Sequence, residues 1–251
     1  MFERSEGCYN TKMQDITFKV DGQKLQGKLF YPEIIKEKNP AVIFVHGWMS
    51  NYKGYILRAE ALADMGFISL LFDLRGHGES DGKLGEVTAE KSVEDVLASY
   101  DFINSLPKVD KNNISIVGAS YGGYITAIVS DKRKLDSIVL RVPAIYPNTT
   151  YSIPKVKEID KERKVYRQSI IGKNDNFALE IISKYIGKIL LIESEKDQLI
   201  PHQVIQNFEN AINSNADYEK IIMKDADHSL TKEKWRKEYI EILRKWFKDL
   251  I

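Results

Sequence analysis

The sequence predicts an α/β protein with a mostly parallel β-sheet, antiparallel strands at its N-terminal edge and helices on both faces. Its 251 residues are enough for one large domain. Short, nearly continuous apolar runs recur along the chain, as expected of parallel strands that are covered on both faces. Amphipathic helical patterns separate several of these runs. Such alternation of strand and helix is typical of a parallel sheet.

Composition and charge exclude several classes of protein. The chain is 43% hydrophobic and 29% charged, and no apolar run approaches the ~18 residues of a membrane span. Thirty-seven basic and 36 acidic residues leave a net charge of +1, so neither nucleic acid nor a membrane is expected as a partner. We expect a small-molecule substrate and a monomer or homodimer.

The single cysteine, Cys8, cannot form an internal disulfide or contribute to a thiolate metal cluster. The polar start of the chain, 1–12, has no apolar signal core. These features predict a cytoplasmic location.

The N-terminal strands are expected at 15–20 and 24–31, where Asp21-Gly22 between alternating runs signals a tight hairpin. The later apolar runs predict parallel strands at 41–45, 67–72, 114–117, 137–140 and 188–192, and a last strand is expected at 218–223. Apolar residues recur at helical spacing from 89 to 106, which predicts a crossover helix. A stripe that includes Trp235, Tyr239 and Trp246 predicts a final helix packed on the core.

One long segment interrupts the alternation of strands and helices. Residues 143–185 precede the next strand, and so long an insertion predicts a helical lid over a core of 1–142 and 186–251. Its charged run, 155–164, is interpreted as a solvated helix face. Each tyrosine in the segment, taken singly, is better explained by packing of the lid onto the core. Taken together with one upstream tryptophan, the tyrosines favour a pocket for an aromatic or medium-sized acyl group. The candidate substrate-binding residues are Trp48, Tyr146, Tyr151 and Tyr166.

A Gly-x-Ser-x-Gly pattern, Gly118 to Gly122, joins a predicted buried strand to a predicted helix. In such a turn, small neighbours let strand and helix pack closely, and the serine is held exposed in a strained conformation. Ser120 is therefore the candidate nucleophile. The alternative interpretation is a tight turn with an incidental serine.

A serine nucleophile needs a histidine as base and an acid to orient it. Of four histidines, His228 follows the last predicted strand, at the carboxyl edge of the sheet. The acid is expected after the preceding strand, where Asp197 is favoured over Glu193 and Glu195. The order serine, acid, histidine fits this interpretation. Asp197 could instead act only as a helix N-cap.

Two upstream loops follow predicted strands. In His46-Gly47-Trp48, the backbone N–H of Trp48, together with that of Tyr121, is positioned to form an oxyanion hole. The loop 73–82 lacks the glycine spacing of a dinucleotide-binding loop. We interpret it as a structural turn in which Asp73 and Arg75 tie loops together.

With these residues in view, the chain from about residue 15 onward resembles the α/β-hydrolase superfamily. Five segments of the chain are similar to successive signatures of that superfamily: His46-Gly-Trp, Asp73-Leu-Arg-Gly-His-Gly-Glu-Ser, Gly118-Ala-Ser-Tyr-Gly-Gly, Glu195-Lys-Asp and Ala226-Asp-His. Within the superfamily, the chain looks like feruloyl- and cinnamoyl-esterase-type carboxylesterases. The resemblance implies the α/β-hydrolase fold, Ser120, Asp197 and His228 as a triad, and Trp48 and Tyr121 as oxyanion donors. The turn that carries the serine, Ser120-Tyr-Gly-Gly-Tyr124, is however more similar to that of prolyl-oligopeptidase-type enzymes. The resemblance therefore does not decide whether the leaving group is an alcohol or an amine.

The sequence therefore predicts a carboxylesterase that acts through an acyl-enzyme and needs no cofactor or metal, since no metal-binding motif occurs. Two alternatives remain. The same site could cleave acyl-peptides or thioesters, or the fold could serve a non-catalytic binding protein.

Overall fold

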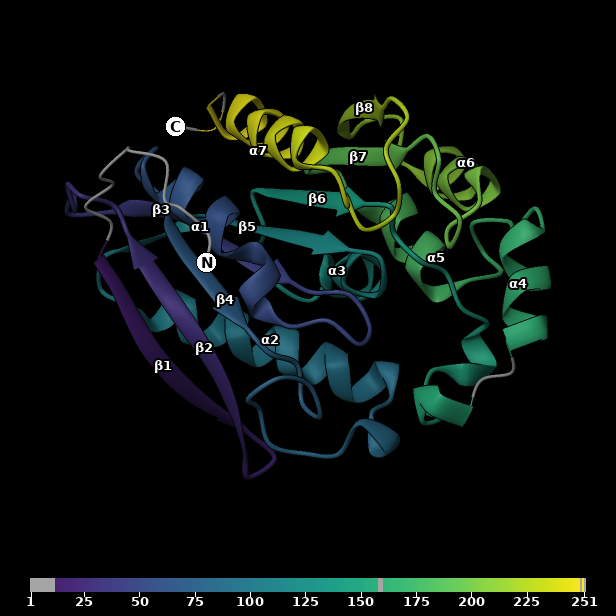
Figure 1. Ribbon diagram of the computed structural model, residues 1–251, viewed down its shortest axis with the longest axis horizontal. Coiled ribbons are helices and arrows are strands. Elements are labelled where there is room, and N and C mark those ends of the chain that lie inside the picture. The colour runs from purple at the N-terminus through teal and green to yellow at the C-terminus, as the bar shows by residue number, and fades with distance from the viewer. Residues whose placement is uncertain (1–11, 158–159, 249, 251) are drawn as a thin grey trace.

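The computed structural model describes residues 12–157, 160–248 and 250, and Cys8 lies outside these ranges. An eight-stranded sheet in the order β1-β2-β4-β3-β5-β6-β7-β8 forms its centre (Figure 1). The strands β1 and β2 run antiparallel to their neighbours, and the others are parallel. Their bounds are β1 Lys12–Val20, β2 Gln23–Tyr31, β3 Asn39–Val45, β4 Ile68–Phe72, β5 Val109–Ala119, β6 Ser137–Arg141, β7 Lys188–Ser194 and β8 Asp217–Met223.

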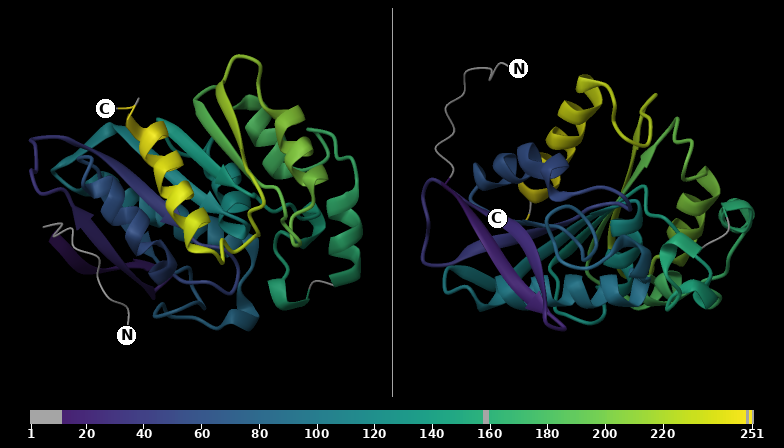
Figure 2. Two further views of the ribbon diagram at one scale, coloured as in Figure 1. Left: turned by 45° about the horizontal axis from the view of Figure 1, so that its top comes forward. Right: turned by 60° about the horizontal axis from the view of Figure 1, so that its bottom comes forward.

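Helices cover both faces of this sheet (Figure 2). The helices α1 (Ile56–Ala63) and α7 (Glu233–Lys248) bury their apolar residues against one face. The opposite face is covered by α2 (Ala89–Ser105), α3 (Tyr121–Val129), α5 (Phe177–Lys184) and α6 (His202–Ala211). In the described part of the chain, no helix has the length and apolarity needed to cross a membrane.

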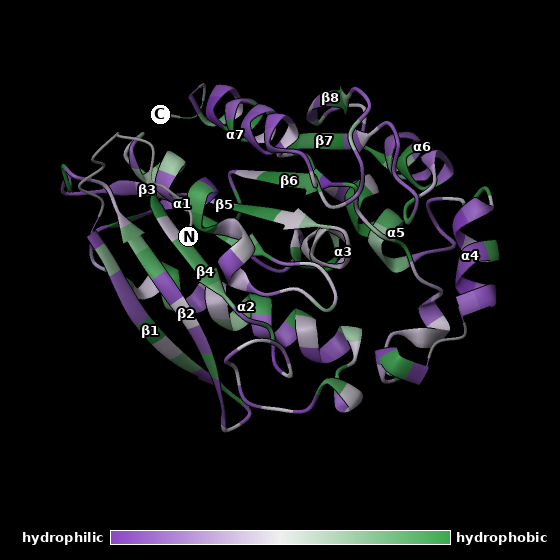
Figure 3. Ribbon diagram, in the orientation of Figure 1, coloured by the Kyte–Doolittle hydropathy of each residue, from purple (hydrophilic) through white to green (hydrophobic). Residues whose placement is uncertain are grey.

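The central strands are mainly apolar where they are buried, which agrees with their position between two helical layers (Figure 3). All five residues of β4 and of β6 are buried. The last helix is amphipathic instead, and it buries Trp235, Tyr239, Leu243 and Phe247 against the sheet. The predicted fold class is confirmed.

The segment 143–185 contains two short 3₁₀ helices, Asn148–Thr150 and Lys155–Lys157. These are followed by the α-helices α4 (Asp160–Gln168) and α5. Ala178, Leu179 and Ile182 of α5 are buried in the hydrophobic core beside α3, so α5 is part of the helical layer. The earlier portion of the segment carries residues that line the cavity described below. The division into a core and a lid at 143 and 185 stays a prediction.

Close packing of α3 against the sheet depends on glycine. A Cβ atom at Gly122 would lie 2.2 Å from the carbonyl oxygen of Val45, and one at Gly118 would lie 2.4 Å from the carbonyl oxygen of Gly122. Both separations are far below van der Waals contact, and the atoms concerned belong to backbone. The helix therefore approaches β3 and β5 only because these positions carry no side chain.

We predict that Gly122→Ala lowers the thermal unfolding midpoint by several degrees, because the added methyl group forces α3 away from β3. Gly85→Ala is the matched control, since a Cβ at Gly85 meets no atom within 4 Å. Thermal unfolding followed by circular dichroism measures both. Equal midpoints for the two variants would contradict this account of the packing.

Candidate active site

The turn between β5 and α3 holds Ser120 in a strained backbone conformation, with φ 53° and ψ −117°. Non-glycine residues rarely adopt such angles, and they persist only where neighbouring contacts enforce them. Two contacts do so: the Ser120 N–H donates to the carbonyl of Arg141 at 3.0 Å, and the Ser120 carbonyl accepts from the N–H of Ala144 at 2.9 Å. The serine is thus fixed at the carboxyl edge of the sheet.

The loop after β8 carries His228, and the loop after β7 carries Asp197. The Nδ1 atom of His228 lies 2.7 Å from Oδ2 of Asp197. The other carboxylate oxygen of Asp197 accepts hydrogen bonds from the amides of Leu199 and Ile200, each at 2.8 Å. Asp197 therefore both orders its own loop and holds the imidazole, with Nε2 left for a further partner.

The two competing acids have other partners. Glu193 is buried, with Oε1 2.5 Å from Nδ1 of His202 and Oε2 3.5 Å from Nζ of Lys220. Glu195 is exposed, and its carboxylate accepts from the amide of Asp225 at 2.8 Å. Among these three acids in the described structure, only Asp197 contacts His228.

Ser120 and His228 line the same cavity, which has a volume of about 710 Å³. Their side chains make no hydrogen bond to one another in the described structure. Catalytic hydrogen bonds are often long before substrate binds, so the shared cavity is the informative observation. His46, His77 and His202 are absent from the described lining of this cavity.

The backbone N–H groups of Trp48 and Tyr121 are the predicted oxyanion donors. In the described residues, neither amide has a backbone acceptor. The ring of Tyr121 is buried, and its hydroxyl donates to Ser92 Oγ at 2.8 Å, so its side chain is structural. The indole of Trp48 makes edge contacts with the rings of His77 at 4.9 Å and Tyr121 at 5.5 Å, and it also lines the cavity.

The structure separates the three predicted lid tyrosines. Tyr146 lines the cavity and is almost fully buried. Tyr151 makes an edge contact with Phe177 at 5.7 Å, and the Tyr166 hydroxyl accepts from the side-chain amide of Asn176 at 3.1 Å. Neither Tyr151 nor Tyr166 is among the described residues that line the cavity.

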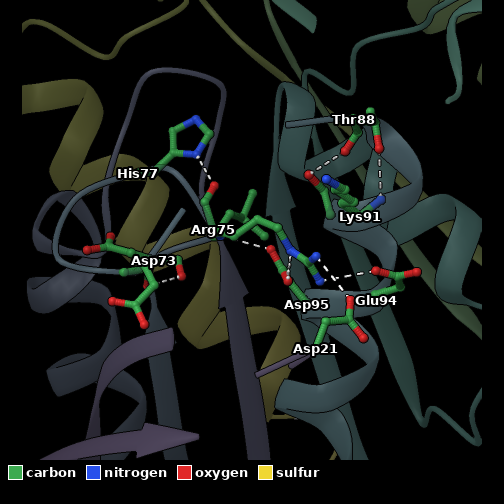
Figure 4. A network of polar contacts seen from close by, with 12 residues as sticks. Asp21, Asp73, Arg75, His77, Thr88, Lys91, Glu94 and Asp95 are labelled. Atoms are coloured by element: carbon green, nitrogen blue, oxygen red, sulfur yellow. Dashed lines mark hydrogen bonds and ion pairs between the residues drawn. The ribbon is translucent and has the colours of Figure 1, made fainter. Parts of the chain in front are cut away.

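A polar network centred on the buried pair Arg75 and Asp95 follows β4 (Figure 4). Arg75 donates from Nε to Asp95 at 2.7 Å, and its Nη atoms lie 3.2 Å from Asp21 and 3.1 Å from Glu94. Burial raises the pKa of Asp95 to about 6, although the charge of Arg75 opposes this. These contacts join the loop after β4 to the β1–β2 hairpin and to α2.

Asp73 accepts hydrogen bonds from the amides of Tyr52 at 2.7 Å and Glu79 at 2.8 Å. His46 completes the support. Its Nδ1 donates to the Gly47 carbonyl at 2.8 Å, and its Nε2 accepts from the Leu74 amide at 3.0 Å. Asp73, like Arg75, therefore ties loops together as the sequence predicts.

The sequence does not predict the basic side chains of the cavity, which are Arg58, Arg141, Lys155, Arg163 and Arg167. Interpretation of 155–164 as a solvated helix face is wrong for Lys155, which is 4% exposed. Its Nζ lies 3.3 Å from the ring centroid of Tyr146, so its ammonium group lies against an aromatic ring and not in solvent. Arg141 could have been suspected, because it directly follows the predicted strand 137–140, next along the chain after the Ser120 turn and its helix.

Comparison with known proteins identifies the family. Residues 36–176, more than half of the chain, match the family described as serine aminopeptidase, S33. The chain belongs to this family of α/β hydrolases. The predicted membership of the superfamily is confirmed, and the protein is a hydrolase by family.

Curated relatives include the mitochondrial palmitoyl-protein thioesterase ABHD10 of Bos taurus, 28% identical over 220 residues that cover 78% of this chain and 69% of the relative. The thiohydrolase aneE of Aspergillus aculeatus is 36% identical over 119 residues, which cover 45% of this chain and 36% of the relative.

Two solved structures share the fold. Est1E of Butyrivibrio proteoclasticus, solved with ferulic acid bound, has a TM-score of 0.75 at 19% identity over 94% of this chain and 98% of its own. The Pyrococcus furiosus esterase Pf2001 has a TM-score of 0.72 at 22% identity over 98% of this chain and 96% of its own.

In residues 12–157, 160–248 and 250, no group of three or more His, Cys, Asp or Glu side chains is arranged to hold a metal ion. The expected independence from metal and cofactor stays a prediction.

We predict that Asp197→Asn lowers kcat/KM for ester hydrolysis by orders of magnitude, up to ~10⁴-fold, because the amide favours the wrong histidine tautomer. Glu195→Gln is the matched control in the same loop and should change kcat/KM little. Steady-state kinetics on one ester measures both. A larger loss in Glu195→Gln than in Asp197→Asn would refute the choice of acid.

His46 makes stability depend on pH. Burial lowers its pKa from 6.5 to about 3, so below pH 6.5 the unfolded chain binds a proton at His46 that the folded chain does not. We predict that this residue lowers the free energy of unfolding by at most about 1.4 kcal/mol per pH unit as pH falls from 6.5 toward 3.

Urea unfolding at pH 7 and pH 5 measures the effect. His46→Gln keeps an acceptor for Leu74 but does not titrate, so it should lose less stability between these two pH values than the unmodified protein. Identical losses in both proteins would contradict the assignment.

Proposed function

We propose that this protein is a serine hydrolase that cleaves carboxylic esters of small to medium acyl groups, aromatic ones included, through an acyl-enzyme intermediate. One observation carries the proposal: His228, held by Asp197 at 2.7 Å, lines the same cavity as a serine fixed at a strained strand-to-helix turn. Membership of a hydrolase family supports it.

In the acylation step, Ser120 Oγ attacks the ester carbonyl carbon while His228 Nε2 takes the hydroxyl proton. Asp197 keeps Nδ1–H of the imidazole oriented and stabilises the imidazolium that forms. The amides of Trp48 and Tyr121 donate to the oxyanion of the tetrahedral intermediate. His228 then returns its proton to the leaving alcohol, and the acyl group remains on Ser120.

Deacylation repeats these roles with water as nucleophile. His228 takes a proton from the water, whose oxygen attacks the acyl carbon, and then returns the proton to Ser120 Oγ as the acid leaves. The strained turn keeps Ser120 in place in both half-reactions. No cofactor is needed for either step.

An aromatic side chain in the cavity supports acceptance of aromatic acyl groups. Trp48 lines the cavity, and stacking on its indole favours planar acyl groups. Tyr146 also lines the cavity, but its ring is almost fully buried and lies against Lys155. The ferulic acid in the related Est1E structure agrees with this proposal. Tyr151 and Tyr166 would act on the pocket through the packing of the segment that carries Tyr146.

Thioester hydrolysis is the second candidate, because two curated relatives are named as a thioesterase and a thiohydrolase. The same residues would act, with a thiolate as the leaving group. Relative kcat/KM values for matched O-acyl and S-acyl substrates separate the two functions. A non-catalytic binding role is less favoured, because it gives no reason for the Asp197–His228 pair beside Ser120. A cytoplasmic location remains part of the proposal.

Hydrolysis of 4-nitrophenyl acetate and 4-nitrophenyl cinnamate tests the proposal. The unmodified protein should cleave both, and Ser120→Ala should retain only the residual rate that binding and the oxyanion hole provide. Ser50→Ala and Ser229→Ala remove other serines that line the cavity and should keep most of the activity. Full activity in Ser120→Ala, or its loss only in one of the other variants, would overturn the assignment.

A further inference from the structure

The cavity beside Ser120 is strongly basic. Its described lining includes five basic side chains, Arg58, Arg141, Lys155, Arg163 and Arg167, and neither aspartate nor glutamate, although Arg163 pairs with Asp160 outside the lining. The whole chain carries a net charge of only +1, so this concentration of positive charge is local. A concave surface lined by one sign of charge attracts ligands of the opposite sign.

Arg141 is the most unusual of these cations, because it is 6% exposed and has no carboxylate partner within 4 Å in the described structure. Its Nη2 donates to the carbonyl of His228 at 2.6 Å and to Ser194 Oγ at 3.2 Å, and lies 3.5 Å from the carbonyl of Asp227. Its buried Nε has no hydrogen-bond partner. A buried guanidinium without a counter-charge is unfavourable unless a ligand compensates it.

Arg58 approaches the same place from α1. Its guanidinium carbon lies 5.0 Å from the ring centroid of Tyr239, and that of Arg141 lies 5.5 Å from the same centroid. The Nη1 of Arg58 donates to the carbonyl of Gly54, whereas its buried Nε has no partner. Two guanidinium groups therefore lie near one tyrosine ring, and the Nε–H of each has no hydrogen-bond acceptor.

Tyr239 supplies a third donor. Its hydroxyl is buried without a hydrogen-bond partner, and burial raises its pKa to about 12, so it stays protonated at neutral pH. Burial also lowers the pKa of Arg141, and the charge of Arg58 lowers it further. Asp197 favours the charged form of Arg141, but His228 and two backbone amides already engage that carboxylate.

We propose that Arg58, Arg141 and Tyr239 form an anion-binding subsite of the catalytic cavity, and that the preferred ester carries a carboxylate or phosphate group. The inference rests on the proposed function and specifies its substrate class. Guanidinium groups suit both anions, because their planar N–H donors match the oxygen spacing. All three residues line the cavity that holds Ser120, so an anionic group of the bound ester would lie beside them.

A purely structural role for Arg141 gives a different expectation. If Arg141 only fastens the His228 loop, its substitution slows every ester equally. A subsite instead changes the ratio of kcat/KM values for charged and neutral esters. This ratio is therefore the informative measurement, and Arg58, which has no contact with His228 in the described structure, provides an independent variant.

Three ester pairs test the proposal on the full chain. The 4-nitrophenyl monoester of adipic acid against 4-nitrophenyl hexanoate puts a carboxylate on the acyl side. The acetate esters 4-acetoxybenzoate and 4-acetoxyphenyl phosphate, each against 4-tolyl acetate, put a carboxylate or a phosphate on the leaving group. These pairs compare the two sides of the scissile bond for a carboxylate, and compare carboxylate with phosphate on the leaving group.

We expect at least one charged ester to exceed its neutral partner by about tenfold or more in kcat/KM. Arg58→Gln and Arg141→Gln should each reduce that ratio towards one, whereas Arg133→Gln, on a surface arginine paired with Asp101, should not. Ratios near one for all three pairs, or ratios unchanged in both cavity variants, would overturn the subsite. Failure to cleave any ester would instead contradict the proposed function.

Discussion

The approach of α3 to β3 is the constraint on which the candidate site depends. A Cβ at Gly122 would come within 2.2 Å of the Val45 carbonyl oxygen, so the helix can begin directly above the sheet only with glycine there. Ser120 precedes this helix and takes a strained conformation because strand and helix are fixed on either side of it. The parallel strands then bring the loops of Asp197 and His228 to the same edge.

Much of the fold could be predicted from the sequence because its signals are local. Continuous apolar runs mark the central strands, and the stripe through Trp235 and Tyr239 marks the last helix. The sequence favours Asp197 as the acid, but it does not exclude Glu193 and Glu195, since three carboxylates share one loop. Only the structure shows that Glu193 is engaged by His202 and Glu195 by Asp225, which leaves Asp197 for His228.

The charge of the cavity could not be predicted, because its basic residues come from distant parts of the chain. Arg58 lies on α1, Arg141 ends β6, and Arg167 lies on α4, so no window of sequence shows them together. A run of charges is usually solvated, and that rule fails where the fold turns Lys155 inward onto the ring of Tyr146. Long-range packing thus decides the chemistry of the substrate cavity.

The central claim is that Ser120 is the nucleophile, activated by His228 and Asp197. Labelling the intact protein with a fluorophosphonate, followed by proteolysis and tandem mass spectrometry, tests it most directly. The account predicts one stoichiometric adduct on the peptide containing Ser120, and slower labelling when His228 is replaced by glutamine, because the serine then loses its base. An adduct on another serine, or an unchanged labelling rate in His228→Gln, would contradict it.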